Sequence, residues 1–303
     1  MTISPLPRNQ ILIGDAAQEL RRLPDASVDM VLTSPPYFRL RDYQVDGQLG
    51  LETHVDRWVD GLDVVTRELK RVLKPTGTLW LNLGDSYSTH LDQGATRKSL
   101  LLGPERVAQR LITNGWTLRN KIVWAKTNPM PSSVRDRLSC AWEYLYIFSL
   151  EPHYNFDLDA IRLPHTSRAA LRLTTEIRRD REAWRGPNGD DASGLARLHQ
   201  RGIVGHPLGK NPGDVWRIAS SNYRGAHHAT FPVELARRTI KAGCPPGGLV
   251  LDPFLGAGTT AVAAEQLGRH WLGIELNPDF AALAETRIAE AQTPGDTTNR
   301  WAA

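Results

Sequence analysis

The sequence predicts an α/β protein built on a doubly wound sheet of parallel strands. Two observations lead to this fold class. Short apolar segments alternate along most of the chain with segments of helical periodicity. Glycine, proline or aspartate follows many of these segments, as is typical of the loops that join strands to helices. Strands that alternate with helices form βαβ units, and such units build parallel sheets.

The first half of the chain supplies most of the elements. An apolar strand leads to Gly14 and Asp15, and the helix after it is stopped by Pro24. The second strand ends at a proline-rich tetrapeptide, and a turn at residues 75–77 precedes the third. Gly115 is the C-terminal stop of a later helix. The predicted strands are residues 10–13, 28–33, 78–83, 121–124 and 144–149. The predicted helices are residues 16–23, 54–73 and 100–114.

The pattern breaks between about residues 151 and 225, where arginine, glycine and proline become frequent. This part is either an inserted recognition segment or a loop region. We therefore divide the chain into residues 1–150, 151–225 and 226–303, with the first and last parts forming one domain. In the last part we expect helices at 232–242, 259–267 and 278–291, and strands at 249–252 and 270–275.

The composition is typical of a soluble globular protein, with 41% apolar and 23% charged residues. No apolar run approaches the roughly 20 residues that span a bilayer. The N-terminus lacks the pattern of a signal peptide, so we expect a cytoplasmic protein. The spacing of Cys140 and Cys244 excludes a CxxC pair and a thiolate zinc site, so we expect two buried thiols and no metal.

The modest basic excess is concentrated in one stretch. The formal net charge is +4 and the isoelectric point is about 9.2. Residues 162–201 contain nine arginines, no lysine and five acidic residues, which accounts for the excess of the whole chain. Such a stretch suits contacts with nucleic-acid phosphates. A solvated helix face is the alternative that charge alone leaves open.

A candidate nucleotide site lies near the end of the chain. A predicted strand leads into a turn with Gly256 and Gly258 and then into a helix, whose first N–H groups are free to bind a ligand. Glu275 ends the next strand, where it could accept both ribose hydroxyls of an adenosine ligand. By itself this segment slightly favours NAD. Too little chain follows Gly258 to complete a dinucleotide-binding sheet, so earlier strands must complete it, in a circularly permuted order.

A second candidate site is Ser34-Pro35-Pro36-Tyr37, just past the carboxyl end of a strand, where ligands bind in open α/β sheets. The prolines stiffen this loop and lack N–H groups, so the loop presents acceptors. The Ser34 hydroxyl and the Pro35 carbonyl could accept the two hydrogens of an aromatic amine such as that of cytosine. Tyr37 could stack on a flipped base. The alternative is a Pro-Pro turn that ends a strand.

The two motifs, in this order, resemble the amino-methyltransferases of DNA, specifically the permuted (beta) group in which the catalytic tetrapeptide precedes the cofactor loop. The resemblance covers nearly the whole chain. The matched segments are residues 14–15, 23–25, 28–29, 33–37, 122–132, 142–143, 213–216, 228–232 and 252–260, and Glu275. The resemblance implies a Rossmann-like S-adenosylmethionine-dependent methyltransferase sheet, circularly permuted. A target-recognition insert at 151–225 would separate a catalytic half, 1–150, from a cofactor-binding half, 226–303.

The resemblance also implies roles for individual residues. The implied catalytic loop is Ser34, Pro35, Pro36 and Tyr37. The implied S-adenosylmethionine site is Asp15, Phe231, Pro232, Asp252, Phe254, Gly256, Gly258, Thr259 and Glu275. For contacts with double-stranded DNA, the resemblance places Lys126, Asn128 and Ser132 near the target-base pocket. The concentration of arginines in residues 162–201 adds Arg178, Arg179 and Arg181 as expected phosphate contacts. A surface loop is the alternative for the first three of these contacts.

A serine at position 34 is associated in this family with cytosine N4 and an aspartate mostly with adenine N6, although serine enzymes that modify adenine exist. We therefore expect methylation of cytosine N4, with adenine N6 as the alternative. Methylation of cytosine carbon 5 requires the thiolate of a Pro-Cys dipeptide, which neither cysteine provides. Two other interpretations are a methyltransferase that acts on RNA or on a protein amide, and a non-catalytic nucleic-acid-binding module. The arginine-rich stretch and the intact motifs argue against them.

The resemblance makes a restriction-modification system, with a cognate restriction endonuclease as partner, one candidate setting, and an orphan methyltransferase is the alternative. We expect the enzyme to act at the bacterial nucleoid in the cytoplasm, as a monomer or a homodimer.

Overall fold

The computed structural model describes residues 6–165, 206–221 and 231–292, and the chain divides into two compact units. The first unit comprises Met1–Asp157 and Asp214–Ala303, and the second comprises Leu158–Gly213. In the described part of the second unit, a 3-10 helix, η2 (Asp159–Ile161), precedes a β-bridge between Leu163 and Lys210. The predicted DNA contacts Arg178, Arg179 and Arg181 lie outside the described residues.

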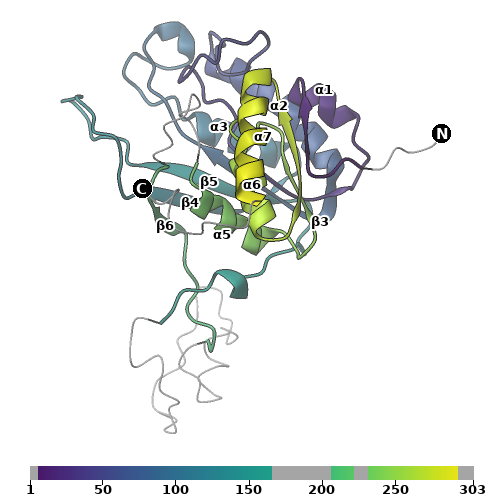
Figure 1. Ribbon diagram of the computed structural model, residues 1–303. Helices are drawn as coiled ribbons and strands as arrows, with labels where there is room; N and C mark the ends of the chain where they lie inside the picture. The colour runs from purple at the N-terminus through teal and green to yellow at the C-terminus, as the bar shows by residue number, and fades with distance from the viewer. Residues whose placement is uncertain (1–5, 166–205, 222–230, 293–303) are drawn as a thin grey trace, which may run out of the picture. The chain divides into compact units, whose positions relative to one another are not determined.

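The first unit is an α/β fold built on an eight-stranded sheet (Figure 1). Its strands are β1 (Gln10–Ile13), β2 (Val28–Thr33), β3 (Leu73–Leu83), β4 (Thr117–Lys126), β5 (Trp142–Ser149), β6 (Val215–Ile218), β7 (Leu249–Asp252) and β8 (His270–Glu275). Their order across the sheet is β1-β8-β7-β2-β3-β5-β4-β6. The strands from the end of the chain, β7 and β8, therefore lie between β1 and β2 from its beginning.

The expectation of a parallel sheet was wrong for β5, which is antiparallel to both of its neighbours, β3 and β4. The other paired strands are parallel. Residues 127–141 join β4 to β5 without a helix, so the chain reverses its direction there instead of crossing over the sheet. An apolar run in a sequence reports that a strand is buried, and it carries no information about the direction of that strand.

Two strands differ from the prediction: β6 was not predicted, and β3 begins earlier than expected. β6 has four residues, of which only Trp216 and Ile218 are buried, so its apolar pattern is too short to recognise. β3 begins at Leu73, and the turn expected at residues 75–77 lies inside this strand. Pairing with β2 continues on both sides of these residues, with a register shift between the pairs Val28–Leu73 and Met30–Thr78, so residues 74–77 form an irregularity within the strand.

Helices cover both faces of the sheet. They are α1 (Ala16–Arg21), α2 (Val55–Val72), α3 (Gly103–Thr113), α5 (Val233–Gly243), α6 (Thr259–Gln266) and α7 (Pro278–Gln292), with a 3-10 helix, η1 (Leu91–Gln93). Helices α1, α2 and α3 lie on one face and α5, α6 and α7 on the other (Figure 1). All residues of β2 and β7 are buried, as is usual for central strands that helices cover on both sides.

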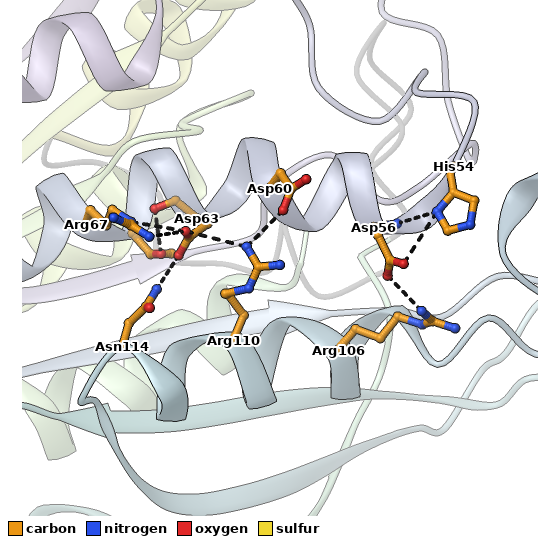
Figure 2. Close-up of polar contacts among 9 residues, drawn as sticks. His54, Asp56, Asp60, Asp63, Arg67, Arg106, Arg110 and Asn114 are labelled. Carbon is orange, nitrogen blue, oxygen red and sulfur yellow. Dashed lines mark hydrogen bonds and ion pairs between the residues drawn. The ribbon is translucent and has the colours of Figure 1, made fainter.

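Ion pairs join α2 to α3 (Figure 2). Arg106 Nη1 lies 2.7 Å from Asp56 Oδ1, and Arg110 Nη1 lies 2.9 Å from Asp60 Oδ1. Asp63, about one turn further along α2, is buried and takes part in the same ladder. Partly exposed ion pairs each contribute little to stability, but their spacing fixes the register of the two helices. The ladder lies on α2, the helix that also supports the candidate site through the buried Trp58.

Two general features of the described residues concern metals and membranes. No group of three or more His, Cys, Asp or Glu side chains in this part of the chain is arranged to hold a metal ion. None of its helices is long and apolar enough to cross a membrane. Cys244 is buried as expected, but Cys140 is exposed, so the expectation of two buried thiols was wrong for Cys140.

Candidate active site

Both predicted sites lie at one edge of the sheet. β2 is parallel to β7, with Met30 opposite Val250, and β7 is parallel to β8. β1 is parallel to β8, with Ile13 opposite Glu275. Because these four strands run in the same direction, the segments that follow them meet at their common carboxyl edge. These segments are residues 14–15, the proline loop (residues 34–37), the glycine turn (residues 253–258) and the residues after Glu275.

The glycine turn owes its shape to two residues with positive φ. Gly256 has a φ of 54° and Gly258 a φ of 79°, in the left-handed region that glycine adopts without strain. A Cβ atom at position 258 would lie 3.0 Å from the Cβ of Ala284, so the close approach of α7 also disfavours a side chain there. Gly258 caps α6 without a side-chain hydrogen bond. The N-terminus of α6 therefore presents N–H groups that no cap side chain satisfies.

Asp252 joins the glycine turn to the strand that leads into the proline loop. Its Oδ1 accepts hydrogen bonds from Thr33 Oγ1 at 2.6 Å and from the Phe254 N–H at 3.1 Å. Its Oδ2 accepts one from Thr260 Oγ1 at 2.6 Å. Burial raises the pKa of Asp252 to about 6, although the hydrogen bonds from the two threonines oppose this rise. The carboxylate thus holds together the two segments that the sequence analysis singled out.

Glu275 braces the glycine turn from the end of β8. Its Oε2 accepts from the Gly256 N–H at 2.7 Å, and its Oε1 accepts from the Asn277 N–H at 2.9 Å. Burial raises the pKa of Glu275, and these backbone donors lower it in part. Each carboxylate oxygen can accept more than one hydrogen bond, so the group keeps acceptor capacity for a ligand.

The other predicted cofactor residues lie around the same strands. Asp15 caps α1, with its Oδ1 accepting from the Gln18 N–H at 2.9 Å. Pro232 is the N-cap of α5, and Phe231 before it is buried. Phe254 is half-buried against the hydrophobic core. The structure thus gives Asp15 and Pro232 local roles at helix starts in addition to any contact with a ligand.

The proline loop is clamped from two sides. The Trp58 Nε1–H donates to the Pro36 carbonyl at 2.9 Å, and Trp58 itself is a fully buried residue of α2. A Cβ atom at Gly50, whose φ is 101°, would lie 2.9 Å from the Tyr37 carbonyl oxygen. At Gly84 a Cβ atom would lie 2.7 Å from Tyr37 Cε2, so the ring can occupy this position only against a glycine. These contacts fix the loop before any ligand binds.

The hydroxyl of Tyr37 is the centre of a polar cluster. It lies 3.1 Å from Ser34 Oγ and 3.1 Å from Asn82 Oδ1. Its shortest contact is with Glu143 Oε2, at 2.7 Å. Burial, and then the negative charge of Glu143, raise the pKa of Tyr37 well above its ordinary value. Glu143 Oε1 in turn lies 2.5 Å from Lys126 Nζ, so a largely buried ion pair completes the cluster.

Asn82 lies in none of the segments matched by the resemblance, and Glu143 lies in one of them, residues 142–143, but was given no role. Asn82 donates to Glu143 Oε2 at 3.1 Å and to the Tyr144 carbonyl at 2.9 Å. One signal was present for each residue: Asn82 is the only strongly polar residue in residues 79–83, and Glu143 is the only acid in residues 142–149. Both interrupt apolar strands near the edge where the proline loop lies. A polar side chain in a buried strand is normally hydrogen-bonded, so each residue should have a hydrogen-bond partner.

Of the predicted contacts in residues 126–132, only Lys126 joins this cluster. Asn128 exchanges hydrogen bonds with the backbone of Ser220, accepting at 2.6 Å and donating at 3.4 Å. Ser132 is exposed, and its Oγ accepts from the Val134 N–H at 3.4 Å. Asn128 and Ser132 therefore lie on the connection between β4 and β5, without a hydrogen bond to the proline loop in the part of the chain that the structure describes.

Comparison with known proteins places these features in a family. The sequence model of the N6_N4 family, described as DNA methylase, matches residues 28–286. The chain is 35% identical to the Type II methyltransferase M.Cfr9I of Citrobacter freundii, over 92% of this chain and 87% of that protein. It is also 35% identical to the Type II methyltransferase M.SmaI of Serratia marcescens, over 92% of this chain and 90% of that protein.

Solved structures agree with this fold. The PvuII DNA methyltransferase (cytosine-N4-specific) is similar with a TM-score of 0.65 and 22% identity, over 97% of this chain and 89% of that one. A DNA modification methylase of Thermus thermophilus, TTHA0409, solved with S-adenosyl-L-methionine, has a TM-score of 0.58 and 28% identity, over 95% of this chain and 97% of that one. The chain therefore belongs to the N6_N4 family of DNA methylases, and it is a DNA methyltransferase that uses S-adenosylmethionine.

Proposed function

We propose that this enzyme methylates the N4 exocyclic amine of cytosine at specific sites in double-stranded DNA, after the base has flipped out of the duplex. The position of the proline loop carries this proposal. The loop follows β2 directly, and β2 lies beside β7, which leads into the glycine turn. The hydrogen bond from Thr33 to Asp252 ties the two segments together. A base held by the loop and a ligand held by the turn would therefore meet at one edge of the sheet.

The residues at this edge fit S-adenosylmethionine. The positive φ of Gly256 and Gly258 lets the backbone approach a ligand closely, and Glu275 has acceptor capacity for ribose hydroxyls. We assign to cofactor binding Asp15, Phe231, Pro232, Asp252, Phe254, Gly256, Gly258, Thr259 and Glu275. When bound, S-adenosylmethionine supplies an electrophilic methyl group, whose former bond electrons remain on sulfur while the amine nitrogen releases a proton.

The proline loop provides acceptors for the target amine. We assign the catalytic role to Ser34, Pro35, Pro36 and Tyr37. The Ser34 hydroxyl and the Pro35 carbonyl accept the two amine hydrogens, which directs the nitrogen lone pair away from the loop. The hydrogen bond from Trp58 holds the loop, and Gly50 leaves room for it to pack closely, so little reorganisation is needed when a base arrives. Tyr37 provides an aromatic face against which a flipped base can stack.

Cytosine N4 is the first choice of target and adenine N6 is the alternative. The serine at position 34 supports cytosine through the resemblance to the serine-type loops of the family. The PvuII enzyme, whose fold is similar, is named as cytosine-N4-specific. The matching family model includes both N6 and N4 in its name, and either amine offers the same two hydrogens to the loop.

We propose that DNA contacts come from both units. Lys126, Asn128 and Ser132 would lie near the target base, and Arg178, Arg179 and Arg181 would bind phosphates. The compact unit Leu158–Gly213 falls within residues 151–225, which supports our assignment of that part as the target-recognition insert between the catalytic half, 1–150, and the cofactor-binding half, 226–303.

The relatives suggest a cellular setting. Several of the similar proteins are named Type II methyltransferases, which supports a role in a restriction-modification system with a cognate endonuclease as partner. We assign the chain to the permuted group of the family, since the proline loop precedes the glycine turn in the sequence. The proposed reaction would take place on cytoplasmic DNA, at the bacterial nucleoid, by a monomer or a homodimer.

Product analysis tests the proposed function. The enzyme would be incubated with labelled S-adenosylmethionine and plasmid DNA from a host without methyltransferases, and the nucleosides identified by mass spectrometry. N4-methylcytosine is the expected product, whereas N6-methyladenine would support the alternative base. Transfer of the label to RNA or protein in parallel reactions, with none to DNA, would overturn the proposal.

The proposed phosphate contacts have their own test. Replacing Arg178, Arg179 and Arg181 with glutamine should weaken DNA binding and flatten its salt dependence. The log–log slope should change by about 0.9 for each lost phosphate contact. Fluorescence anisotropy across a salt series measures this slope, and an unchanged slope would show that these arginines form a solvated surface.

A further inference from the structure

A chain of hydrogen-bonding groups runs from Lys126 to Ser34 through the interior of the candidate site. Lys126 Nζ lies 2.5 Å from Glu143 Oε1, and the other carboxylate oxygen, Oε2, lies 2.7 Å from the Tyr37 hydroxyl. The same hydroxyl lies 3.1 Å from Ser34 Oγ. Lys126 and Glu143 are both largely buried, with side chains 22% and 16% exposed. Solvent therefore does little to compete with the contacts between them.

The hydrogen of the Tyr37 hydroxyl has one favoured acceptor. A phenol carries a single hydrogen, and the candidate acceptors are Glu143 Oε2 at 2.7 Å and Asn82 Oδ1 at 3.1 Å. A bond to an ionised carboxylate is both shorter and stronger than a bond to a neutral amide. Asn82 directs its own amide hydrogens to Glu143 and to the Tyr144 carbonyl. Tyr37 therefore donates to Glu143, and its raised pKa keeps it protonated for this purpose.

This direction determines the role of Ser34. With its only hydrogen directed to Glu143, Tyr37 meets Ser34 Oγ at 3.1 Å through an oxygen lone pair. A hydrogen must lie between the two oxygens, so Ser34 is the donor. A serine hydroxyl has one hydrogen and two acceptor lone pairs. Once the hydrogen points at Tyr37, the lone pairs are what Ser34 can offer to a substrate.

We propose that Lys126 and Glu143 are positioning residues that act through Tyr37 to fix Ser34 as a hydrogen-bond acceptor. Lys126 holds Glu143 through Oε1, Glu143 Oε2 takes the Tyr37 hydrogen, and Tyr37 takes the Ser34 hydrogen. The site then selects a substrate atom that carries hydrogens, such as an exocyclic amine, over a carbonyl oxygen at the same place. We call this series of hydrogen bonds, from Lys126 through Glu143 and Tyr37 to Ser34, the relay. It rests on the proposed function, because it presupposes that Ser34 faces the target base.

A second lysine–glutamate pair on the same strand provides a matched control. Lys121 Nζ lies 2.6 Å from Glu105 Oε1, nearly the same distance as in the pair of Lys126 and Glu143. Glu105 belongs to α3 and has no contact with the proline loop among those that the structure describes. Glu105→Gln removes the same charge from the same kind of pair. It should leave methyl transfer unchanged.

A double-mutant cycle with Ser34 tests the relay. Glu143→Gln and Tyr37→Phe would each be combined with Ser34→Ala. In Glu143→Gln, Lys126 retains the amide oxygen, so the amide nitrogen faces Tyr37 and reverses the direction of the bond. Single-turnover transfer from labelled S-adenosylmethionine to unmethylated plasmid DNA gives the rates. Each variant should be about tenfold slower when Ser34 is present, and less than about twofold slower in the Ser34→Ala background.

The outcomes separate the relay from the proposed function. If wild-type enzyme transfers no label to DNA, the proposed function fails. If wild-type enzyme is active but Glu143→Gln and Tyr37→Phe slow transfer equally in both backgrounds, their role is structural and the relay is overturned. Calorimetry should give unchanged S-adenosylmethionine affinity for both, because Tyr37 and Glu143 lie outside the glycine turn. If Glu143→Gln does not melt cooperatively, the cycle of Tyr37→Phe with Ser34→Ala decides alone, because it keeps the ring in place.

Discussion

The two sides of the candidate site are built in different ways. On the proposed cofactor side, Asp252 and Glu275 accept hydrogen bonds from backbone N–H groups of the glycine turn, and Asp252 also accepts from the hydroxyls of Thr260 and of the distant Thr33. On the proposed catalytic side, Tyr37 is held by side chains from distant parts of the chain, Asn82 and Glu143. The first side is largely backbone geometry, whereas the second is a network of side chains.

This difference predicts how each side responds to change. A glycine turn can be damaged only by distorting its backbone or by removing the acid that braces it, and such damage should act on binding of the cofactor. A side-chain network can change its chemistry while the backbone stays in place, and such changes should act on the rate of transfer. The comparison would fail if a substitution in the glycine turn changed only the rate of transfer, or if a substitution in the side-chain network changed only the affinity for the cofactor.

The largest effect is expected for Ser34→Ala. Removing one preorganised polar group from a transition state typically lowers the rate by about 10²- to 10³-fold. Folding and affinity for S-adenosylmethionine should stay at wild-type levels, because Ser34 lies on the catalytic side. Single-turnover transfer and titration calorimetry measure the two quantities. A near-normal rate would show that the proline loop is not the catalytic loop.

Asp252→Asn should change how stability depends on pH. The rise of the Asp252 pKa from 3.8 to about 6 corresponds to about 3 kcal/mol. Between about pH 4 and pH 6 the unfolded chain loses this proton while the folded chain keeps it. The free energy of unfolding of the wild type should therefore fall across this window and level off above it. Asp252→Asn has no titrating group at this position, so its free energy of unfolding lacks this dependence on pH.

Urea denaturation at several pH values would measure the difference in free energy of unfolding between wild type and Asp252→Asn. From pH 4 to pH 7 the free energy of unfolding of the wild type should fall by up to about 3 kcal/mol relative to that of Asp252→Asn. A difference that stays constant with pH would show that Asp252 titrates as an ordinary exposed carboxyl, contrary to its burial.

The smallest effect is expected for Glu275→Ala. Loss of a hydrogen bond to a charged group costs about 1.5–3 kcal/mol, so S-adenosylmethionine affinity should fall by this amount. Gly256→Asp should also weaken binding, since a side chain there would occupy the space of the turn. Titration calorimetry measures both, and Glu265→Ala, in α6, is a control outside the turn. Wild-type affinity in well-folded Glu275→Ala would remove Glu275 from the cofactor side.

The parts of the fold that sequence predicted are those with local causes. The strand of Val28–Thr33 is apolar throughout most of its length and ends at prolines, and the start of α6 follows a glycine turn, so both were placed correctly. The direction of β5 was not predicted, because a strand's direction depends on which neighbour it pairs with. Likewise β6 is a strand only because β4 pairs with it.

The sequence by itself determined the proline loop, the glycine turn and Glu275, because each is a short motif whose chemistry is contained in neighbouring residues. Only the tertiary structure decided that Glu143 contacts both Tyr37 and Lys126, and that Asp252 joins the two sides through its hydrogen bond with Thr33. The physical reason is that hydrogen bonds act over about 3 Å. Residues 106 positions apart, as Tyr37 and Glu143 are, come within that reach only when the sheet has formed.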